Sequence, residues 1–139
     1  MSTRSSIAVK RADGTVLAVY CHFDGYLEGV GAALLAQHNS QEKAEALVGL
    51  GDLSICSARD GVVAYSRDKG EPFDDVRPHE YVSWDDYRGN VGKQIADNGY
   101  RYVFDGEWRA WGESAGLTPD PLEVGKCITR EASLPENRE

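Results

Sequence analysis

The residues best suited to chemistry are gathered between Tyr20 and Gly31, in the run YCHFDGYLEGVG. His22 and Asp24 are two residues apart, so both side chains lie on one face if a strand continues that far. A carboxylate beside an imidazole can orient it as a general base, which gives a candidate catalytic pair without an identified nucleophile. The alternative is structural, because Asp24-Gly25 also suits a turn in which Asp24 caps the next helix.

The same segment would supply much of the pocket of a small enzyme or ligand-binding module. The candidate lining residues are Arg4, Tyr20, His22, Asp24, Tyr26 and Asp52. Gly25, Gly29 and Gly31 weakly resemble a phosphate loop, but no lysine follows them, and Asp24 and Glu28 would repel an anion there. A nucleotide site is therefore not expected.

A second region of interest is acidic and carries aromatic residues. Its candidate partner-binding residues are Asp68, Glu71, Phe73, Asp74, Asp75, Glu80, Trp84, Asp85 and Asp86. Carboxylates raise the rate of association with a basic surface, and aromatic anchors supply contact energy. The same residues could instead solvate a loop and begin a helix, so the pattern leaves both interpretations open.

Charge and cysteine content exclude several classes of function. With 23 acidic and 15 basic residues the net charge is −8, which works against direct binding of nucleic acid or anionic membrane and favours a basic protein partner. Cys21, Cys56 and Cys127 lack the paired spacing of a zinc site or a disulfide framework, so we expect reduced thiols, no metal and no cofactor. No apolar run approaches the about 18 residues of a membrane helix, and no signal-peptide core is present, which predicts a cytoplasmic protein.

Two Asp-Gly turns predict hairpins that position these residues. A two-residue turn at Asp13-Gly14 would place Ile7 opposite Tyr20 and Val9 opposite Ala18. At the second turn, in YRYVFDGEWRAW, a two-residue loop pairs Val103 with Trp108. A three-residue loop instead pairs Phe104 with Trp108 and Tyr102 with Ala110, and the more continuous apolar face favours it.

Apolar periodicity predicts helices near 27–38, 41–48 and 84–96, with Asn39 and Ser83 as N-caps of the last two. Strands are expected at 53–56 and 61–66, and an exposed loop over 67–81. The fold class predicted is α+β: an antiparallel sheet of about four or five strands, built largely from the two hairpins and packed with about three short helices. Residues 1–112 would form a single domain, and 113–139 an extended tail docked on it or on a partner.

Four stretches together carry a family resemblance: MSTRSSI at the start, YCHFDGYLEGVG, LLAQH at 34–38 and ALVGLGDLS at 46–54. Over roughly its first 54 residues the chain resembles a group of small bacteriophage and prophage proteins. Phe23 stands where members of the group often have tryptophan, and Ile55-Cys56 departs from their pattern of a small residue and leucine. The group brings no established activity, so no catalytic residue is carried over from it.

The resemblance implies a phage or prophage setting and therefore the cytoplasm of a bacterial host. Small acidic proteins in that setting often inhibit host defence enzymes, an analogy of context rather than of structure. We therefore expect a protein that binds and inhibits a defence complex of the CRISPR type, or another nucleic-acid-handling complex, by protein contact. The alternative is a small enzyme or ligand-binding module that uses His22, Asp24 and Tyr26. A phage accessory protein that merely oligomerises is a third possibility, and the oligomeric state is left open.

Overall fold

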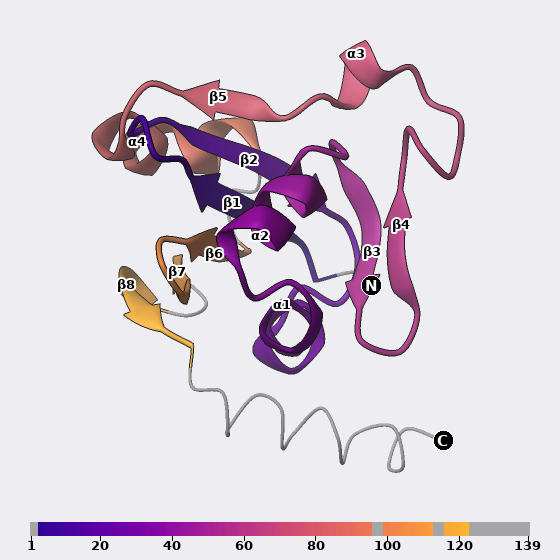
Figure 1. The fold of residues 1–139 in the computed structure, drawn as a ribbon, viewed down its shortest axis with the longest axis horizontal. Helices are drawn as coiled ribbons and strands as arrows, with labels where there is room; N and C mark the ends of the chain where they lie inside the picture. Colours follow the sequence, from indigo (N-terminus) through magenta and orange to yellow (C-terminus); the bar gives the residue numbers. More distant parts are fainter. Residues whose placement is uncertain (1–2, 96–98, 113–115, 123–139) are drawn as a thin grey trace.

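The computed structural model describes residues 3–95, 99–112 and 116–122, and they form a mixed sheet with helices on both faces (Figure 1). The strands are β1 Ser5–Lys10, β2 Val16–Cys21, β3 Leu53–Ser57, β4 Gly61–Ala64, β5 His79–Tyr81, β6 Tyr100–Phe104, β7 Trp108–Gly112 and β8 Gly116–Pro121. The helices are η1 Leu27–Gly31, which is a π-helix, α1 Ala32–Gln37, α2 Gln41–Val48, α3 Phe73–Val76 and α4 Trp84–Gln94. The strand order is β4-β3-β2-β1-β6-β7-β8, and β5 pairs with β2.

The α+β class is confirmed, but the expected antiparallel sheet of four or five strands is wrong. Among the described residues the sheet has eight strands, and the pairs β1–β6 and β2–β3 are parallel. Parallel pairing needs a long crossover, and β2 reaches β3 through η1, α1 and α2. Hairpin patterns in a sequence report only strands that are neighbours along the chain, so they do not reveal these pairs.

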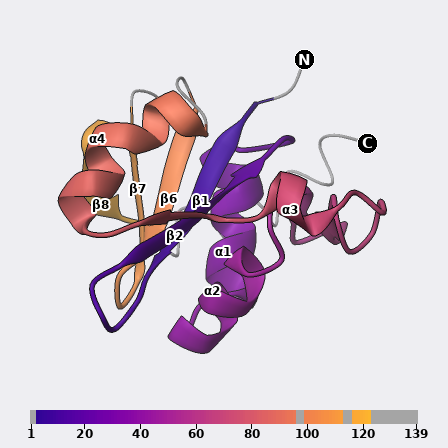
Figure 2. The ribbon, with the colours of Figure 1, turned by 90° about the horizontal axis from the view of Figure 1, so that it is seen from above.

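Each face of the sheet carries its own apolar core. On the face of α1 and α2, Ile7, Val19 and Tyr102 pack with helix residues such as Leu34 and Val48. On the face of α4, Ala18, Val103 and Trp111 pack against Tyr87 and Val91. Figure 2 shows α1 and α2 together and α4 set apart from them beside β6 and β7. The central strand β1 is consequently buried over Ser5–Val9.

The two hairpins differ in how well their patterns define the register. The second pairs Phe104 with Trp108 and Tyr102 with Ala110, which confirms the three-residue loop. In the first, Ile7 pairs with Val19 and not with Tyr20, so the predicted register is wrong by one residue.

Two features explain why the predicted register of the first hairpin is wrong. The Asp13 Oδ1 atom accepts hydrogen bonds from the Thr15 backbone N–H at 3.0 Å and from its hydroxyl at 2.6 Å, which builds a longer loop. Since both faces of these strands are apolar, alternation could not select the register.

Local signals located the helices with errors of a few residues. Ser83 Oγ accepts a hydrogen bond from the Asp86 N–H at 3.1 Å, so the predicted cap of α4 is confirmed. The cap of α2 is Ser40, not Asn39, and its hydroxyl accepts from the Lys43 N–H at 3.1 Å. The expected helix over 27–38 consists of the π-helix η1 followed by α1, which ends at Gln37.

Two segments contain more regular structure than expected. The predicted loop 67–81 includes α3 and β5, and β5 pairs antiparallel with β2. Within the predicted tail, Gly116–Pro121 forms β8 against β7, whereas 113–115 and 123–139 lie outside the described residues. Among the helices described, none is long and apolar enough to cross a membrane.

Candidate functional site

The glycines of the segment 20–31, which we call the glycine-rich segment, allow close contact between backbones. The Gly25 N–H donates to the Thr3 carbonyl at 2.8 Å, and a Cβ at Gly25 would lie 2.7 Å from the Ser5 Cβ. A Cβ at Gly29 would lie 2.2 Å from the Asp24 carbonyl oxygen. That oxygen accepts from the Val30 N–H at 2.9 Å. Gly25 and Gly29 are therefore explained by the close packing of backbones around them.

Asp24 is the turning point of the segment. Its φ of +57° is in the left-handed region, so the chain leaves the line of β2 at this residue. The turn is fixed from the sheet, because the buried Tyr102 hydroxyl donates to the Gly25 carbonyl at 2.7 Å. The chain thus changes direction at Asp24-Gly25, but the predicted capping of the next helix by Asp24 is wrong, because the N-cap of η1 is Tyr26 and it has no side-chain hydrogen bond.

The structure gives His22 and Asp24 separate partners. His22 Nδ1 is 2.5 Å from the Tyr20 hydroxyl, and the Tyr26 hydroxyl donates to Asp24 Oδ1 at 3.3 Å. Within the described part of the chain no hydrogen bond joins His22 to Asp24. The two residues therefore do not form the imidazole–carboxylate pair that their spacing suggested.

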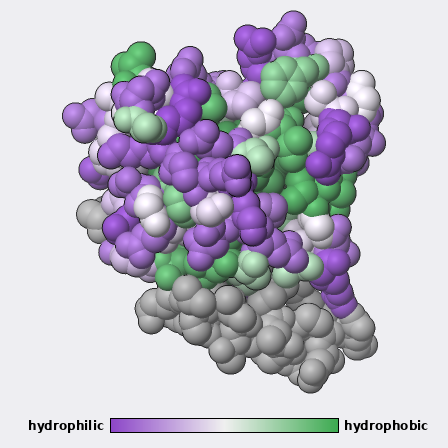
Figure 3. Space-filling model, viewed as in Figure 1, coloured by the Kyte–Doolittle hydropathy of each residue, from purple (hydrophilic) through white to green (hydrophobic). Residues whose placement is uncertain are grey.

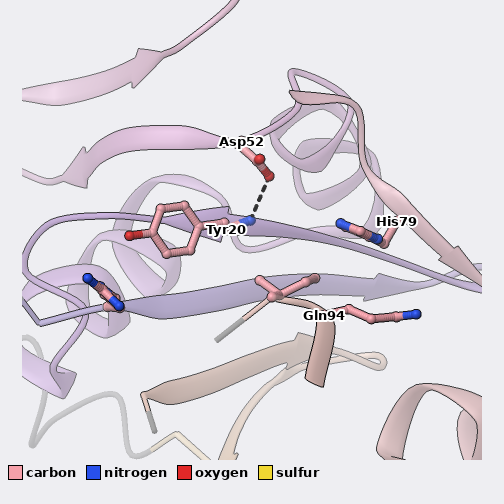
Figure 4. Close-up of a pocket in the computed structure, with 6 residues that line it drawn as sticks. Tyr20, Asp52, His79 and Gln94 are labelled. Carbon is pink, nitrogen blue, oxygen red and sulfur yellow. Dashed lines mark hydrogen bonds between the residues drawn. The ribbon is translucent and has the colours of Figure 1, made fainter. Parts of the chain in front are cut away.

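A cavity of about 410 Å³ opens where two strands share one edge of β2. At the start of β2, Ala18 pairs with His79 of β5, and at its end Cys21 pairs with Leu53 of β3. Between these contacts, Asp52 Oδ1 accepts from the Tyr20 backbone N–H at 3.0 Å. We call this cavity the fork cavity, and Figure 4 shows Tyr20, Asp52, His79 and Gln94 around it.

The fork cavity brings together Arg4, Tyr20 and Asp52 of the predicted ligand pocket and leaves His22, Asp24 and Tyr26 outside its lining. His79, Gln94 and Ile95 complete it. These three gave no signal in the sequence, because their place depends on where β5 and α4 dock.

The chemistry of the fork cavity is polar and of mixed charge. Burial raises the pKa of the Asp52 carboxyl, although the Tyr20 N–H and the nearby His79 lower it. Burial also raises the pKa of the Tyr20 phenol. An exposed guanidinium at Arg4 and a half-buried carboxylate at Asp52 suit a small ligand with groups of both charges.

The described cysteines are packed thiols. Cys21 and Cys56 are free and buried, and burial raises the pKa of Cys21 to about 12 and that of Cys56 further still. A thiol with so high a pKa is a poor nucleophile at neutral pH. Cys127 lies outside the described residues, and within them no three His, Cys, Asp or Glu side chains are grouped to hold a metal ion.

Most of the predicted partner-binding residues fall into two groups, one in and before α3 and one at the start of α4, and Glu80 lies in β5 between these helices (Figures 1 and 2). We call the group around α3 the α3 patch, and it consists of Asp68, Glu71, Phe73, Asp74 and Asp75. All five residues are exposed, and Phe73 is 43% exposed. The acidic segment is thus not one continuous surface.

The second group, at the start of α4, serves the fold. Trp84 packs against Tyr87 and Trp111, with ring centroids 5.2 and 6.4 Å away. Asp86 accepts from the Val82 N–H at 3.0 Å and from the Asn90 amide at 2.9 Å, and Glu80 pairs with Arg11. Asp85 is exposed in the first turn of the helix. Trp84 therefore contributes to the core beneath α4 rather than standing out as an anchor.

No protein-family model matches this chain, and no curated protein or solved structure matches it significantly. The functional argument therefore rests on the geometry of the α3 patch and of the fork cavity.

Proposed function

We propose that this protein binds a basic surface of another protein through the α3 patch. The chain resembles phage and prophage proteins, so the partner would be a bacterial defence complex of the CRISPR type or another nucleic-acid-handling complex. The protein would inhibit that complex by covering its basic surface. The observation that carries the proposal is an exposed phenylalanine, Phe73, with exposed carboxylates on both sides of it in the sequence.

Two of the four carboxylates of the α3 patch are paired with arginines, and two are available to a partner. Asp68 pairs with Arg67 at 2.8 Å, and Asp74 pairs with Arg77 at 3.0 Å on a solvent-exposed surface. Glu71 and Asp75 have no ion-pair partner in the described part of the chain. Such carboxylates would steer a basic partner, and burial of the Phe73 ring would supply contact energy.

The test is capture of partners from bacterial lysate by the tagged protein at low and high salt, followed by mass spectrometry. The variant Glu71→Gln/Asp74→Asn/Asp75→Asn removes three charges from the patch, and Phe73→Ala removes the anchor. Glu42→Gln/Asp60→Asn/Asp120→Asn is the matched control, because it removes three exposed carboxylates elsewhere. Any captured complex is then reconstituted from purified parts and assayed for its nuclease activity.

A salt-sensitive complex that the control retains and both patch variants lose supports the proposal. We expect Phe73→Ala to weaken binding by about tenfold or more, the effect of losing about 1.4 kcal/mol or more. Equal binding by the patch variants and the control would contradict it. Retention of a complex whose activity is unchanged would support binding and reject inhibition.

A second candidate function is binding of a small polar ligand in the fork cavity, which corresponds to the enzyme or ligand-binding alternative. The specific observation is that Arg4, Tyr20 and Asp52, distant in sequence, line one space. Thermal-shift screening with amino acids and nucleotides tests it, with Arg4→Gln as the variant and Arg59→Gln as the control. A ligand that stabilises the control and not Arg4→Gln supports this function, whereas ligands that act equally on both exclude it.

His22→Ala separates catalysis from binding by the α3 patch, because only catalysis would need the imidazole.

A further inference from the structure

A second cavity, of about 350 Å³, lies between α2 and β4 on the α1/α2 side of the sheet, away from the fork cavity. We call it the α2–β4 cavity, and its lining is Gln37, His38, Lys43, Ala46, Leu47, Leu50, Val62 and Arg67. Its volume is within the range of about 300–1,000 Å³ typical of small-molecule sites. Figure 3 shows hydrophobic side chains gathered over β3 and β4, among hydrophilic neighbours.

The apolar part of the lining is continuous with the core. Leu47 is 3% exposed within that core, and Leu50 and Val62 are half-buried against it. Two hydrogen bonds fix the surroundings: Gln37 Nε2 donates to the Ala58 carbonyl at 3.3 Å, and Arg67 Nη2 donates to the Val62 carbonyl at 2.8 Å. These bonds hold α1 to the turn before β4, and Arg67 to β4, at the margin of the cavity.

The charge of the lining is opposite to that of the whole protein. In a chain with 23 acidic and 15 basic residues, this cavity is lined by Lys43 and Arg67 and by no carboxylate. Arg67 is paired with Asp68, whereas Lys43 has no ion-pair partner among residues 3–95, 99–112 and 116–122. Lys43 is consequently the cation most available to an anionic group.

His38, which also lines the cavity, carries a buried polar atom without a hydrogen-bond partner among the described residues. Its Nε2 atom is buried and has no hydrogen-bond partner in the described part of the chain, a condition that is costly unless a ligand or water completes it. Burial, with Lys43 nearby, lowers the pKa of His38, so the imidazole is neutral at pH 7 and Nε2 can donate if it carries the proton. The His38 carbonyl in turn accepts from Trp108 Nε1 at 3.0 Å.

The geometry points to a binding site for a small amphipathic carboxylate in the α2–β4 cavity. Its hydrocarbon part would lie on Leu47, Leu50 and Val62, and its carboxylate would face Lys43 and accept a hydrogen bond from His38 Nε2. Charge selects the carboxylate over a neutral alkyl compound, and the apolar lining selects it over a small anion such as acetate.

Nitrogen-15 NMR of the full chain tests this inference, with octanoate as the probe. The Trp108 indole N–H reports on the site through His38, while the Trp111 indole, which donates to the Tyr87 hydroxyl at 3.2 Å on the other face of the sheet, is the internal control. We expect octanoate to shift the Trp108 signal and leave that of Trp111 unchanged. Octanol and acetate, which lack the charge and the chain respectively, should bind more weakly by about twofold or more.

Paired variants identify the cation. Lys43→Gln should weaken octanoate binding by about two- to fivefold, whereas Lys93→Gln, an exposed lysine on α4, should not change it. Val62→Glu introduces a carboxylate into the lining and should abolish binding, with the Trp111 signal showing that the fold persists. If octanoate shifts both indoles alike, or if Lys43→Gln and Lys93→Gln bind equally, the inference is overturned.

The result is independent of the α3 patch. Glu71→Gln/Asp74→Asn/Asp75→Asn leaves the lining of the α2–β4 cavity untouched and should bind octanoate like the wild type. Loss of partner capture with retained octanoate binding, or the reverse, therefore shows which of the two proposals fails.

Discussion

The glycine-rich segment and the α3 patch have the most unusual compositions in the chain, yet the fold uses them in opposite ways. In the glycine-rich segment, Gly25 and Gly29 allow backbones to approach, and Asp24 turns the chain. In the α3 patch, Phe73 and its acidic neighbours are exposed. Gly25 and Gly29 are thus explained by sterics, whereas the carboxylates of the α3 patch are exposed to solvent.

Among the tests of this contrast, Gly29→Ala should have the largest effect on the free energy of unfolding. The new Cβ would meet the Asp24 carbonyl at 2.2 Å, so the turn must deform, and we expect a loss of about 3 kcal/mol in the free energy of unfolding. Gly89→Ala, at a helical glycine with open space around it, is the control and should gain about 0.5–1 kcal/mol. Urea denaturation measures both. A Gly29→Ala protein as stable as the wild type would show that packing does not require this glycine.

The next effect concerns the hydroxyl that fixes the turn. Tyr102→Phe removes the buried hydrogen bond to the Gly25 carbonyl and should cost about 1–2 kcal/mol. Tyr100→Phe is the matched control, since its half-buried ring stacks on Tyr102 with centroids 6.3 Å apart. The same denaturation experiment compares them, and equal stabilities of the two variants would refute the role of the Tyr102 hydroxyl.

A smaller effect depends on pH at the fork cavity. Because burial raises the pKa of Asp52 above 3.8, the folded state binds more protons than the unfolded state as pH rises through that range, and stability falls. Asp52→Asn keeps an acceptor for the Tyr20 N–H and removes this loss. The free energy of unfolding of the variant, relative to that of the wild type, should therefore increase between acid and neutral pH.

Asp13→Asn provides the control for that measurement. The Thr15 hydroxyl and N–H lower the pKa of Asp13, so this carboxylate stabilises the fold above its ordinary pKa and the benefit is lost as pH falls. The free energy of unfolding of Asp13→Asn, relative to that of the wild type, should therefore decrease as pH rises. Stability curves of the two variants that diverge from the wild type in the same direction would contradict the assignment.

The smallest effect completes the comparison. Glu71→Gln/Asp74→Asn/Asp75→Asn should change the free energy of unfolding by less than about 0.5 kcal/mol, because exposed residues outside the core carry little stability. Thermal and urea denaturation measure it. A loss comparable with that of Tyr102→Phe would mean that the patch has a structural role after all.

Local interactions account for what the sequence could predict. Ser83 was found as a cap because its partner is three residues away, and the aromatic faces of the second hairpin defined its register. The predicted register of the first hairpin is wrong by one residue because the Asp13 side chain, and not the Asp-Gly pair alone, shapes the loop.

The rest depends on contacts between distant parts of the chain. The partner of β1 in the parallel pair is β6, which starts at Tyr100, and no local pattern specifies that choice. The fork cavity depends in the same way on where β5 and α4 dock. Arg4, Tyr20 and Asp52 could be suggested as a group by their polar character, but His79 and Gln94 could not.

The position of β1 at the centre of the sheet also sets the order of assembly during synthesis. Its edge toward β2 can pair within a few residues, but its edge toward β6 stays open until Tyr100–Phe104 emerge. At about 5–20 residues per second, that interval of about 90 residues lasts about 5–20 s. For this time the nascent chain exposes an apolar strand edge that can pair with other chains, so yield on expression should depend on translation rate and on chaperones.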